Sequence, residues 1–487
     1  MLKIRISSPR ARTADHMPGS RVVIVGGGYT GATVAKLLVE RGFGHVEDVT
    51  VFEPRTQLGS GLAYDTSDPD VRLNVAAHRM RAVPGTPSAF LDWMQSSGTL
   101  TVDPAAVTSE GIFARRRDFG RFMHQQLAPL VEDGTIRHLH ETVSTVYRVN
   151  DQWHVTGAGG TTIVADMLIV ATGHPPASRP RALEKLSKPT AMRVTDAMAP
   201  DALQDICRAT DILIVGSGLT ALDALVRLNA QGHQGKISLL SRSGLLPRPH
   251  AGGGFSPYGN FHDETLTSAR RILVKVRATI SEAETHGIPW QSVFDALRQQ
   301  AQSIWQRLPD AERLKLLRRL RRWYDVHRYR MPPQVSAALT EGMASGHVEN
   351  LIGDLTSVRQ DGRDLVARIT TKSNRDFEHR CGHILLATGP DFRNYGVHQK
   401  FLLSLFREGT VQSDALGLGL VCDRGGRVIS LDGSPNTSLF VAGPPARPAF
   451  GELIGVPEIA AQAANLVEVV LRTLARRNRT IFIGRQD

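Results

Sequence analysis

Three glycines near the start of the chain have the spacing at which a backbone turn can receive a phosphate group. In the segment RVVIVGGGYTGATVAKLLVERG, Gly26, Gly28 and Gly31 follow a short apolar strand and open a helix whose apolar residues recur three and four positions apart. Without side chains in the way, backbone N–H groups and the positive end of the helix can meet a pyrophosphate. Tyr29 and Thr30 complete the turn. The segment therefore predicts a dinucleotide-binding site.

A carboxylate stands at the end of the next expected strand, residues 49–54. Glu53 follows Gly28 by 25 residues, and an acidic residue at this distance can accept hydrogen bonds from both hydroxyls of an adenosine ribose. The glycines together with Glu53 are more specific than the glycines alone. The alternative is a glycine-rich turn in an ordinary α/β domain.

The same order of strand, glycine turn and helix returns in DILIVGSGLTALDALVRLNAQG. Gly216 and Gly218 are followed by Leu219 and Thr220, and Ala221 replaces the last glycine. Alanine at that position still permits the helix to pack closely on the strand. We therefore predict a second dinucleotide site in the same chain.

The strand that follows the second turn, KISLLSR, ends in a hydroxyl and a guanidinium instead of a carboxylate. Ser241 and Arg242 suit the 2′-phosphate of NADPH, which a carboxylate would repel. Arg248, in the next loop, is a second candidate for this phosphate. The sequence favours NADPH over NADH and leaves NADH open. The alternative is that Arg242 is an ordinary surface arginine.

Two α/β units are needed to position these groups. The segment TTIVADMLIVATG is expected to be a single strand ending in a turn that contains Thr172 and Gly173, and HILLATGP ends in a second turn of the same type. The predicted fold class is α/β, with two Rossmann-like dinucleotide-binding domains and a helical insertion at about residues 264–344. Two such domains in one chain point to FAD together with a nicotinamide cofactor.

Composition excludes several other classes of protein. The chain has 487 residues, of which 41% are hydrophobic and 22% charged, as in folded globular proteins. Three cysteines without a C-x-x-C motif predict neither a disulfide framework nor a zinc site, and we expect no bound metal. No apolar run approaches the ~18 residues that span a bilayer, and residues 1–19 are expected to be a disordered tail. A cytoplasmic location is expected, with no membrane partner.

Five further segments carry a resemblance to a known family: GSGLAYDTSDPDVRLNVAAHRM, ARRRDFGRFM, SLLSRSGLLPRPH, YDVHRYRMPP and LFVAGPPARPAFGELIGVPEIAAQA. With the two glycine turns they resemble the two-dinucleotide-binding flavoproteins that include flavin-containing and N-hydroxylating monooxygenases, and most closely the FAD/NAD(P)-binding protein family within them. The resemblance extends from residue 21 to about residue 465. Members that the chain resembles include urate hydroxylases and amino-acid N-oxygenases.

The resemblance implies a division of the chain into domains. An FAD-binding domain would be formed by residues 20–185 and 389–487. The NAD(P)H-binding domain would be formed by residues 186–388, between the two turns of the ATG type, and would carry the helical insertion.

The resemblance also implies contacts with the flavin. Asn74 and Met80 would lie near the isoalloxazine ring, and the turn at Gly443 and Pro444 would approach its pyrimidine edge. The residues themselves say less about Asn74. It stands between apolar neighbours, so it is expected either to be buried with a hydrogen-bonding partner or to cap a turn.

A basic segment, RLKLLRRLRRWYDVHRYR, contains eight arginine and lysine residues interleaved with aromatic ones. Its two interpretations are a solvated helix face and a funnel that leads anions into the active site. His327, Arg328 and Arg330 are the candidate substrate-binding or catalytic residues in it. The net charge of +11 suits phosphate-bearing cofactors and small anions as well as nucleic acid, and we expect no nucleic-acid partner.

The absence of a C-x-x-C motif limits which electron acceptor a bound flavin could use. Without a thiol pair, molecular oxygen is the predicted acceptor. Together with the family resemblance, this implies an FAD-dependent NAD(P)H monooxygenase that hydroxylates a small anionic nitrogen-containing metabolite, with conversion of urate to 5-hydroxyisourate as the leading candidate. The alternatives are an amino-acid N-oxygenase, for example of aspartate, and an FAD/NADPH reductase without oxygenation. The sequence gives no indication of the oligomeric state.

Overall fold

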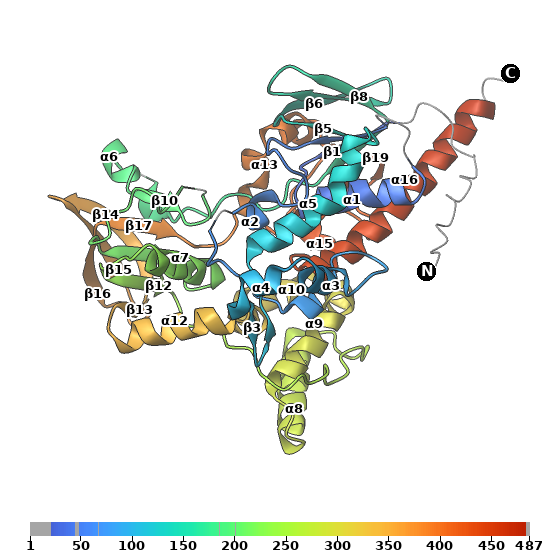
Figure 1. The fold of residues 1–487 in the computed structure, drawn as a ribbon. Coiled ribbons are helices and arrows are strands. Elements are labelled where there is room, and N and C mark those ends of the chain that lie inside the picture. The colour runs from blue at the N-terminus through green and yellow to red at the C-terminus, as the bar shows by residue number, and fades with distance from the viewer. Residues whose placement is uncertain (1–20, 44–47, 67, 185, 200, 484–487) are drawn as a thin grey trace, which may run out of the picture.

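The computed structural model describes residues 21–43, 48–66, 68–184, 186–199 and 201–483. The expected tail over residues 1–19 lies outside the described residues. Figure 1 shows two α/β bodies, one around a six-stranded sheet and one around a five-stranded sheet, with helix α8 (Ala269–Thr285) projecting away from both.

A six-stranded sheet forms the first body, in the strand order β18-β19-β9-β1-β2-β5. Its strands are β1 (Val22–Val25), β2 (Val49–Phe52), β5 (Ile136–Leu139), β9 (Met167–Val170), β18 (Arg427–Ile429) and β19 (Pro435–Val441). Neighbouring strands are parallel except for the edge pair β18 and β19. Because β19 pairs with β9, strands from both ends of the sequence share one sheet.

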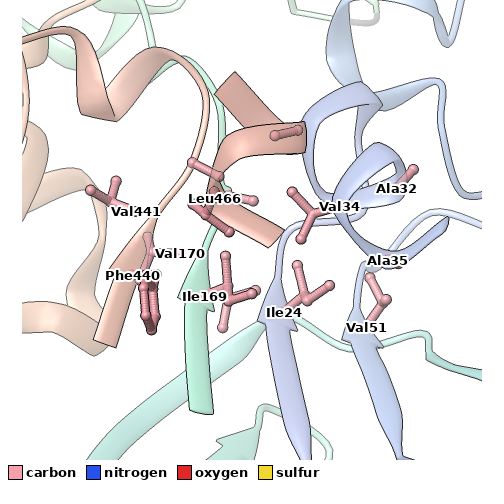
Figure 2. Close-up of a cluster of buried hydrophobic side chains, with 14 of the residues drawn as sticks. Ile24, Ala32, Val34, Ala35, Val51, Ile169, Val170, Phe440, Val441 and Leu466 are labelled. Carbon is pink, nitrogen blue, oxygen red and sulfur yellow. The ribbon is translucent and has the colours of Figure 1, made fainter. Parts of the chain in front are cut away.

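The core of the first body lies between this sheet and the helices α1 (Tyr29–Glu40) and α16 (Val456–Ile483). Figure 2 shows Ile24 and Ile169 of the central strands together with Val34 of α1 and Leu466 of α16. All four side chains are completely buried, and each such burial stabilises the fold by about 1.5–3 kcal/mol. This core therefore holds α16, from the end of the chain, against α1.

A five-stranded parallel sheet forms the second body, in the strand order β10-β17-β11-β12-β13. Its strands are β10 (Val194–Asp196), β11 (Ile212–Val215), β12 (Ile237–Ser241), β13 (Val348–Ile352) and β17 (His383–Leu386). Helices α7 (Leu219–Ala230) and α12 (Pro333–Ala344) cover one face with an apolar cluster. Apolar side chains of an antiparallel sheet, among them Leu365, Ala367 and Ile369, cover the other face, so both faces are buried, as parallel sheets require.

The two bodies repeat one topology. The strand order β9-β1-β2-β5 corresponds to β17-β11-β12-β13, and a three-stranded antiparallel sheet precedes β9 and β17 alike. These small sheets consist of β6 (Val143–Val149), β7 (Gln152–Gly157) and β8 (Thr162–Ala165), and of β14 (Asp354–Asp361), β15 (Asp364–Thr370) and β16 (Asp376–Cys381). The predicted fold class, α/β with two Rossmann-like units, is confirmed.

The expectation of a single strand over residues 161–173 is wrong. The segment forms β8 in the antiparallel sheet and β9 in the six-stranded sheet. The chain changes sheets at Asp166, where the backbone N–H groups of Asp166 and Met167 both donate to the carbonyl oxygen of Arg21. Both halves consist of strand-forming residues, so the pattern alone could not reveal the break.

Helices dominate residues 264–344, as expected. After α8 they are α9 (Trp290–Arg307), α10 (Asp310–Lys315), the π-helical turn η4 (Leu316–Leu320), α11 (Arg321–Arg328) and α12. The other elements are α2 (Gly61–Tyr64), η1 (Ala77–Arg79), α3 (Ala89–Ser96), α4 (Thr99–Val102), η2 (Pro104–Ala106), β3 (Val107–Thr108), β4 (Gly111–Ile112), α5 (Arg116–Glu132), η3 (Arg181–Leu183), α6 (Lys188–Ala191), η5 (Phe392–Asn394), α13 (Tyr395–His398), η6 (Lys400–Leu402), α14 (Leu403–Arg407), η7 (Pro444–Ala446) and α15 (Arg447–Phe450). Within the described ranges, no helix combines the length and the apolar character needed to cross a membrane.

Helix α9 connects the two bodies. In sequence it lies between strands of the second body, yet Arg298 forms an ion pair with Glu458 at the start of α16, with Nε and Oε1 2.6 Å apart. The indole of Trp305 donates to the carbonyl oxygen of Pro448 at 2.8 Å. The helical segment is therefore anchored on the first body.

Candidate cofactor sites

The first glycine turn joins β1 to α1 at the carboxyl end of the six-stranded sheet. Gly26 has a φ of 99°, where glycine is favoured, and a Cβ at this position would lie 2.6 Å from the carbonyl oxygen of Ala171. A Cβ on Gly31 would lie 1.8 Å from the carbonyl oxygen of Gly26. Gly28 begins α1 without a side-chain cap, so the first N–H groups of the helix are free to meet a pyrophosphate.

Glu53 directly follows β2 and is 4% exposed. Its Oε2 accepts a hydrogen bond from the backbone N–H of Gly27 at 3.0 Å. Its Oε1 accepts from the backbone N–H and from the guanidinium of Arg55, at 3.1 and 2.9 Å. The carboxylate is thereby fixed beside the glycine turn, and Oε2, which accepts a single hydrogen bond, keeps capacity for a hydroxyl donor. A tight turn, an uncapped helix and a fixed carboxylate together fit the adenosine half of a dinucleotide such as FAD.

A second turn, from the far end of the chain, closes on the start of α1. Gly443 has a φ of 71°, and a Cβ on it would lie 2.5 Å from the hydroxyl oxygen of Thr30. Its backbone N–H donates to the buried side chain of Gln462 at 3.1 Å, and Pro444 is buried where η7 begins. Gly443 and Pro444 thus lie at the same end of the sheet as the first glycine turn.

The turn after β9 lies beside these two. The hydroxyl of Thr172 is hydrogen-bonded to the phenol of Tyr395, which is completely buried, and Gly173 has a φ of 73°. The phenol of Tyr29 donates to the carbonyl oxygen of Ala82 at 2.9 Å. The side chain of Tyr29 therefore ties α1 to the segment that follows η1, while its backbone belongs to the glycine turn.

Asn74 and Met80 lie in the first body, near its junction with the second. The carbonyl oxygen of Asn74 is 3.0 Å from Nε2 of His250, which belongs to the loop after β12. Asn74 itself is half-buried, and Met80 is almost completely buried. Their proximity to the isoalloxazine stays a prediction.

The second glycine turn reproduces the first. Gly216 has a φ of 125°, and a Cβ on it would lie 2.2 Å from the carbonyl oxygen of Ala387. Ala221 is completely buried, so its methyl group is accommodated where the last glycine would stand. Gly218 begins α7 without a side-chain cap and is exposed, and a Cβ on it would meet no atom within 4 Å. This empty space at an uncapped helix start fits a second pyrophosphate.

Strand register shows what takes the place of Glu53 in the second body. Phe52 pairs with Val25 at the end of β1, and Leu240 pairs with Val215 at the end of β11. Ser241, which follows Leu240, therefore stands where Glu53 stands. Its hydroxyl oxygen accepts from the backbone N–H of Gly244 at 3.0 Å.

Arg242 and Arg248 are exposed beyond this strand end. Within the described part of the chain, the Arg242 guanidinium has no hydrogen-bonding or ion-pair partner. Leu219 and Thr220 are half-buried at the start of α7. A hydroxyl and two exposed guanidinium groups in place of a carboxylate fit a ribose that carries a 2′-phosphate.

The basic segment divides into an exposed and a buried part. Arg318, Arg319 and Arg322 are exposed on η4 and α11. Nε of Arg328, by contrast, lies 2.6 Å from Oε1 of Glu452, and both side chains are buried. Arg330 is buried in an ion pair with Asp295. The solvated-face interpretation therefore describes only the first part of the segment.

His327 lies in an aromatic cluster. Its ring stacks on Phe294, with centroids 4.8 Å apart, and meets the ring of Trp290 edge-on at the same distance. Nδ1 is 2.7 Å from the carbonyl oxygen of Trp323. Burial lowers the pKa of His327 from its ordinary value. A role of His327, Arg328 or Arg330 in substrate binding stays a prediction.

Several residues that contact these turns were not predicted from the sequence, notably Arg55, Tyr395 and Gln462. Each is an ordinary polar residue without a motif around it, and its partner is distant along the chain, except for Arg55. For Arg55 the signal was present, because a cation two residues after a strand-end carboxylate can pair with it.

The three cysteines are free: Cys207 is exposed, and Cys381 and Cys422 are buried. In the ranges that the structure describes, no cluster of histidine, cysteine and acidic side chains could hold a metal ion.

Residues 23–175 match a family model described as FAD-NAD(P)-binding. The matched segment extends from β1 to just beyond the turn at Thr172 and Gly173, so it contains the first glycine turn and Glu53. A sequence comparison with curated proteins gives no match.

Solved structures share the fold over nearly the whole chain. An ornithine N-hydroxylase from Kutzneria sp. 744, in a structure with reduced FAD, NADP+ and L-ornithine, has a TM-score of 0.63 at 15% identity, covering 93% of this chain and 99% of that one. The ornithine hydroxylase from Pseudomonas aeruginosa has a TM-score of 0.63 at 14% identity, covering 93% and 99%. L-lysine 6-monooxygenase from Pseudomonas syringae has a TM-score of 0.60 at 16% identity, covering 93% and 100%.

These comparisons define the class of fold. The chain is an α/β protein in which one segment matches an FAD-NAD(P)-binding family model, and it shares its two-unit fold with the ornithine and lysine hydroxylases. The resemblance noted in the sequence is confirmed at this level.

Proposed function

We propose that the protein is an FAD-dependent, NADPH-consuming monooxygenase that hydroxylates a small nitrogen-containing metabolite. The observation that carries the proposal is the pair of equivalent glycine turns, with buried Glu53 after β2 and Ser241 and Arg242 at the matching place after β12. The first strand end suits the free ribose of FAD, and the second suits the phosphorylated ribose of NADPH. The FAD-NAD(P)-binding match and the fold shared with ornithine and lysine hydroxylases support it.

The chain's own residues would bind and orient the cofactors. Gly26, Gly28 and Glu53 would hold FAD, which when bound supplies the redox chemistry between NADPH and molecular oxygen. Gly218 and Arg242 would hold NADPH. The buried turn at Gly443 lies against Thr30 and would help keep water out of the first site.

The cysteines argue against a thiol-reducing alternative. Burial raises the pKa of the Cys381 thiol to about 12 and raises that of Cys422 further, so both stay protonated and unreactive near neutral pH. Cys207 is single and exposed. With no thiol pair in the sequence, oxygen remains the favoured electron acceptor.

Urate is our leading substrate candidate, and an amino acid such as aspartate is the alternative. The test uses purified, FAD-loaded protein with a panel containing urate, L-aspartate, L-ornithine and L-lysine. NADPH oxidation and oxygen uptake are recorded, and products are examined for the gain of one oxygen atom. Substrate-stimulated turnover with an oxygenated product supports the monooxygenase. NADPH oxidation that no compound couples to an oxygenated product would favour the reductase instead.

A further inference from the structure

Two arginines share a single carboxylate at the junction of the two bodies. Arg79 ends η1 in the first body, and its Nη1 lies 2.6 Å from Oδ2 of Asp295 on α9. The other carboxylate oxygen, Oδ1, pairs with Nη2 of Arg330, which follows α11. Asp295 is 8% exposed and Arg330 is 5% exposed. The three residues therefore form a largely buried Arg79–Asp295–Arg330 cluster.

The charges of this cluster do not balance. Two guanidinium groups face one carboxylate, which leaves one positive charge in excess. Two imidazoles that interact with the cluster add no charge to it. Burial, together with Arg330 and Arg79, lowers the pKa of His250 to about 3, and burial and Arg79 lower the pKa of His78. Both imidazoles are therefore neutral at pH 7.

A further ion pair that acts on the cluster is already complete. Arg328 also acts electrostatically on Arg330, but its own charge is matched by Glu452. The excess charge thus belongs to Arg79 and Arg330. An uncompensated buried charge is costly unless a counter-ion is present.

One atom of the cluster lacks a partner. Nε of Arg330 is buried and forms no hydrogen bond to any residue that the structure describes. A buried donor without an acceptor costs about 1–3 kcal/mol. Arg79, by contrast, keeps a third of its side chain exposed, so an incoming ligand can reach the cluster at this residue.

We propose that the Arg79–Asp295–Arg330 cluster is an anion subsite, in which Arg79 binds a carboxylate or similar anionic group of the substrate. Asp295 is a positioning residue, because it fixes both guanidinium groups. Arg330 lies on the other side of Asp295 and contributes the second positive charge. Because it is buried, it does not contact anions in the solvent. The excess charge attracts an anion and repels a cation.

This inference deepens the proposed function and rests on it for the identity of the ligand as substrate. It separates this protein from the ornithine and lysine hydroxylases that share its fold, since a dibasic amino acid would bring an additional positive charge toward Arg79. Urate and aspartate, which carry net negative charge at neutral pH, suit the cluster.

The test is calorimetric titration of the FAD-loaded protein in the absence of NADPH, with urate, L-aspartate and L-ornithine as probes. The variants are Arg79→Gln, Arg79→Lys and a matched control, Arg81→Gln, which removes the same charge from an exposed neighbour. We expect urate or aspartate to bind more tightly than ornithine. Arg79→Gln should weaken this binding roughly tenfold or more. Arg79→Lys should restore part of it, and Arg81→Gln should leave it unchanged.

Three results would overturn the proposal: no binding of either anion to the unaltered protein, tighter binding of ornithine than of both anions, or equal affinities in Arg79→Gln and Arg81→Gln. FAD content and thermal unfolding of each variant verify that the fold is intact. Failure of the proposed function would look different, because anion binding would be normal while NADPH failed to reduce the flavin.

Discussion

A substitution at Gly218 can test cofactor binding separately from folding, because this glycine adjoins empty space. Its backbone is extended, with φ of −82° and ψ of −172°, a conformation that valine adopts readily. Because a Cβ there meets no protein atom within 4 Å, we predict that Gly218→Val folds normally and keeps its FAD. The new side chain would occupy the path of a pyrophosphate, so NADPH binding should fall at least tenfold. Equilibrium titration with NADPH, beside thermal unfolding, measures both effects; unchanged affinity would contradict the second site.

Arg242 provides a test of which nicotinamide cofactor is used. Its guanidinium is exposed and stands one residue beyond Ser241, the position that corresponds to Glu53. A charge-assisted hydrogen bond contributes about 1.5–3 kcal/mol. Arg242→Ala should therefore weaken NADPH binding roughly ten- to a hundred-fold and leave NADH binding almost unchanged. Comparison of the dissociation constants of both cofactors checks this, and equal losses would rule out a 2′-phosphate contact.

Single residues could be predicted wherever their chemistry depends on near neighbours in sequence. Gly26, Gly31 and Gly216 were predicted from spacing, and the structure shows backbone approaches that exclude a Cβ at each. Arg79 and Asp295 were not predicted, because they are 216 positions apart in the chain and neither stands in a motif. Only the packing of α9 on the first body brings them together.

At the scale of elements, one buried ion pair anchors the helical segment on the first body. Arg328 at the end of α11 pairs with Glu452, and the phenol of Tyr324 donates to the same carboxylate. Glu452→Gln would remove the carboxylate that is paired with the buried guanidinium of Arg328. We predict a loss of about 3–5 kcal/mol in the free energy of unfolding, measured by urea denaturation of the FAD-loaded protein.

The matched control for this change is Glu468→Gln on α16. Glu468 pairs with Arg472 and Arg41, and all three side chains are substantially exposed. Exposed pairs contribute little, so this variant should lose no more than about 1 kcal/mol. A similar loss in both variants would show that the Glu452 pair is not an anchor.

Some helices and strands could be predicted from the sequence, and others could not. Helices over residues 264–344 and the strands before each glycine turn have strong periodicity or clear boundaries, and the structure contains them. The strands β8 and β9 could not be separated by pattern, because pairing with different partners, not composition, divides them at Asp166. The docking of α9 on the first body could not be predicted either, since its contacts with Glu458 and Pro448 join distant segments.

At the scale of the whole molecule, the first body is built from segments near both ends of the sequence. Its sheet combines β1, β2, β5 and β9 with β18 and β19, and α16 packs along α1. The turns at Gly26 and Gly443 come from these two ends and meet at one end of the sheet. A cofactor bound there would contact both, and would therefore stabilise the folded chain through its binding free energy.

We therefore predict that the purified protein is yellow, with one FAD per chain, and that removal of FAD lowers the unfolding temperature. At a free FAD concentration a hundred times the dissociation constant, the expected stabilisation is about 2.7 kcal/mol.

Gly28→Val should yield a colourless protein. Its Cβ would also approach the Cα of Gly61 at 3.2 Å, so its stability must be compared with that of the FAD-free unaltered chain. Gly218→Val is the matched control, because it places the same side chain in the equivalent turn of the other body and should remain yellow. Full FAD occupancy in Gly28→Val, measured by flavin absorbance against protein concentration, would remove the basis for placing FAD in the first body.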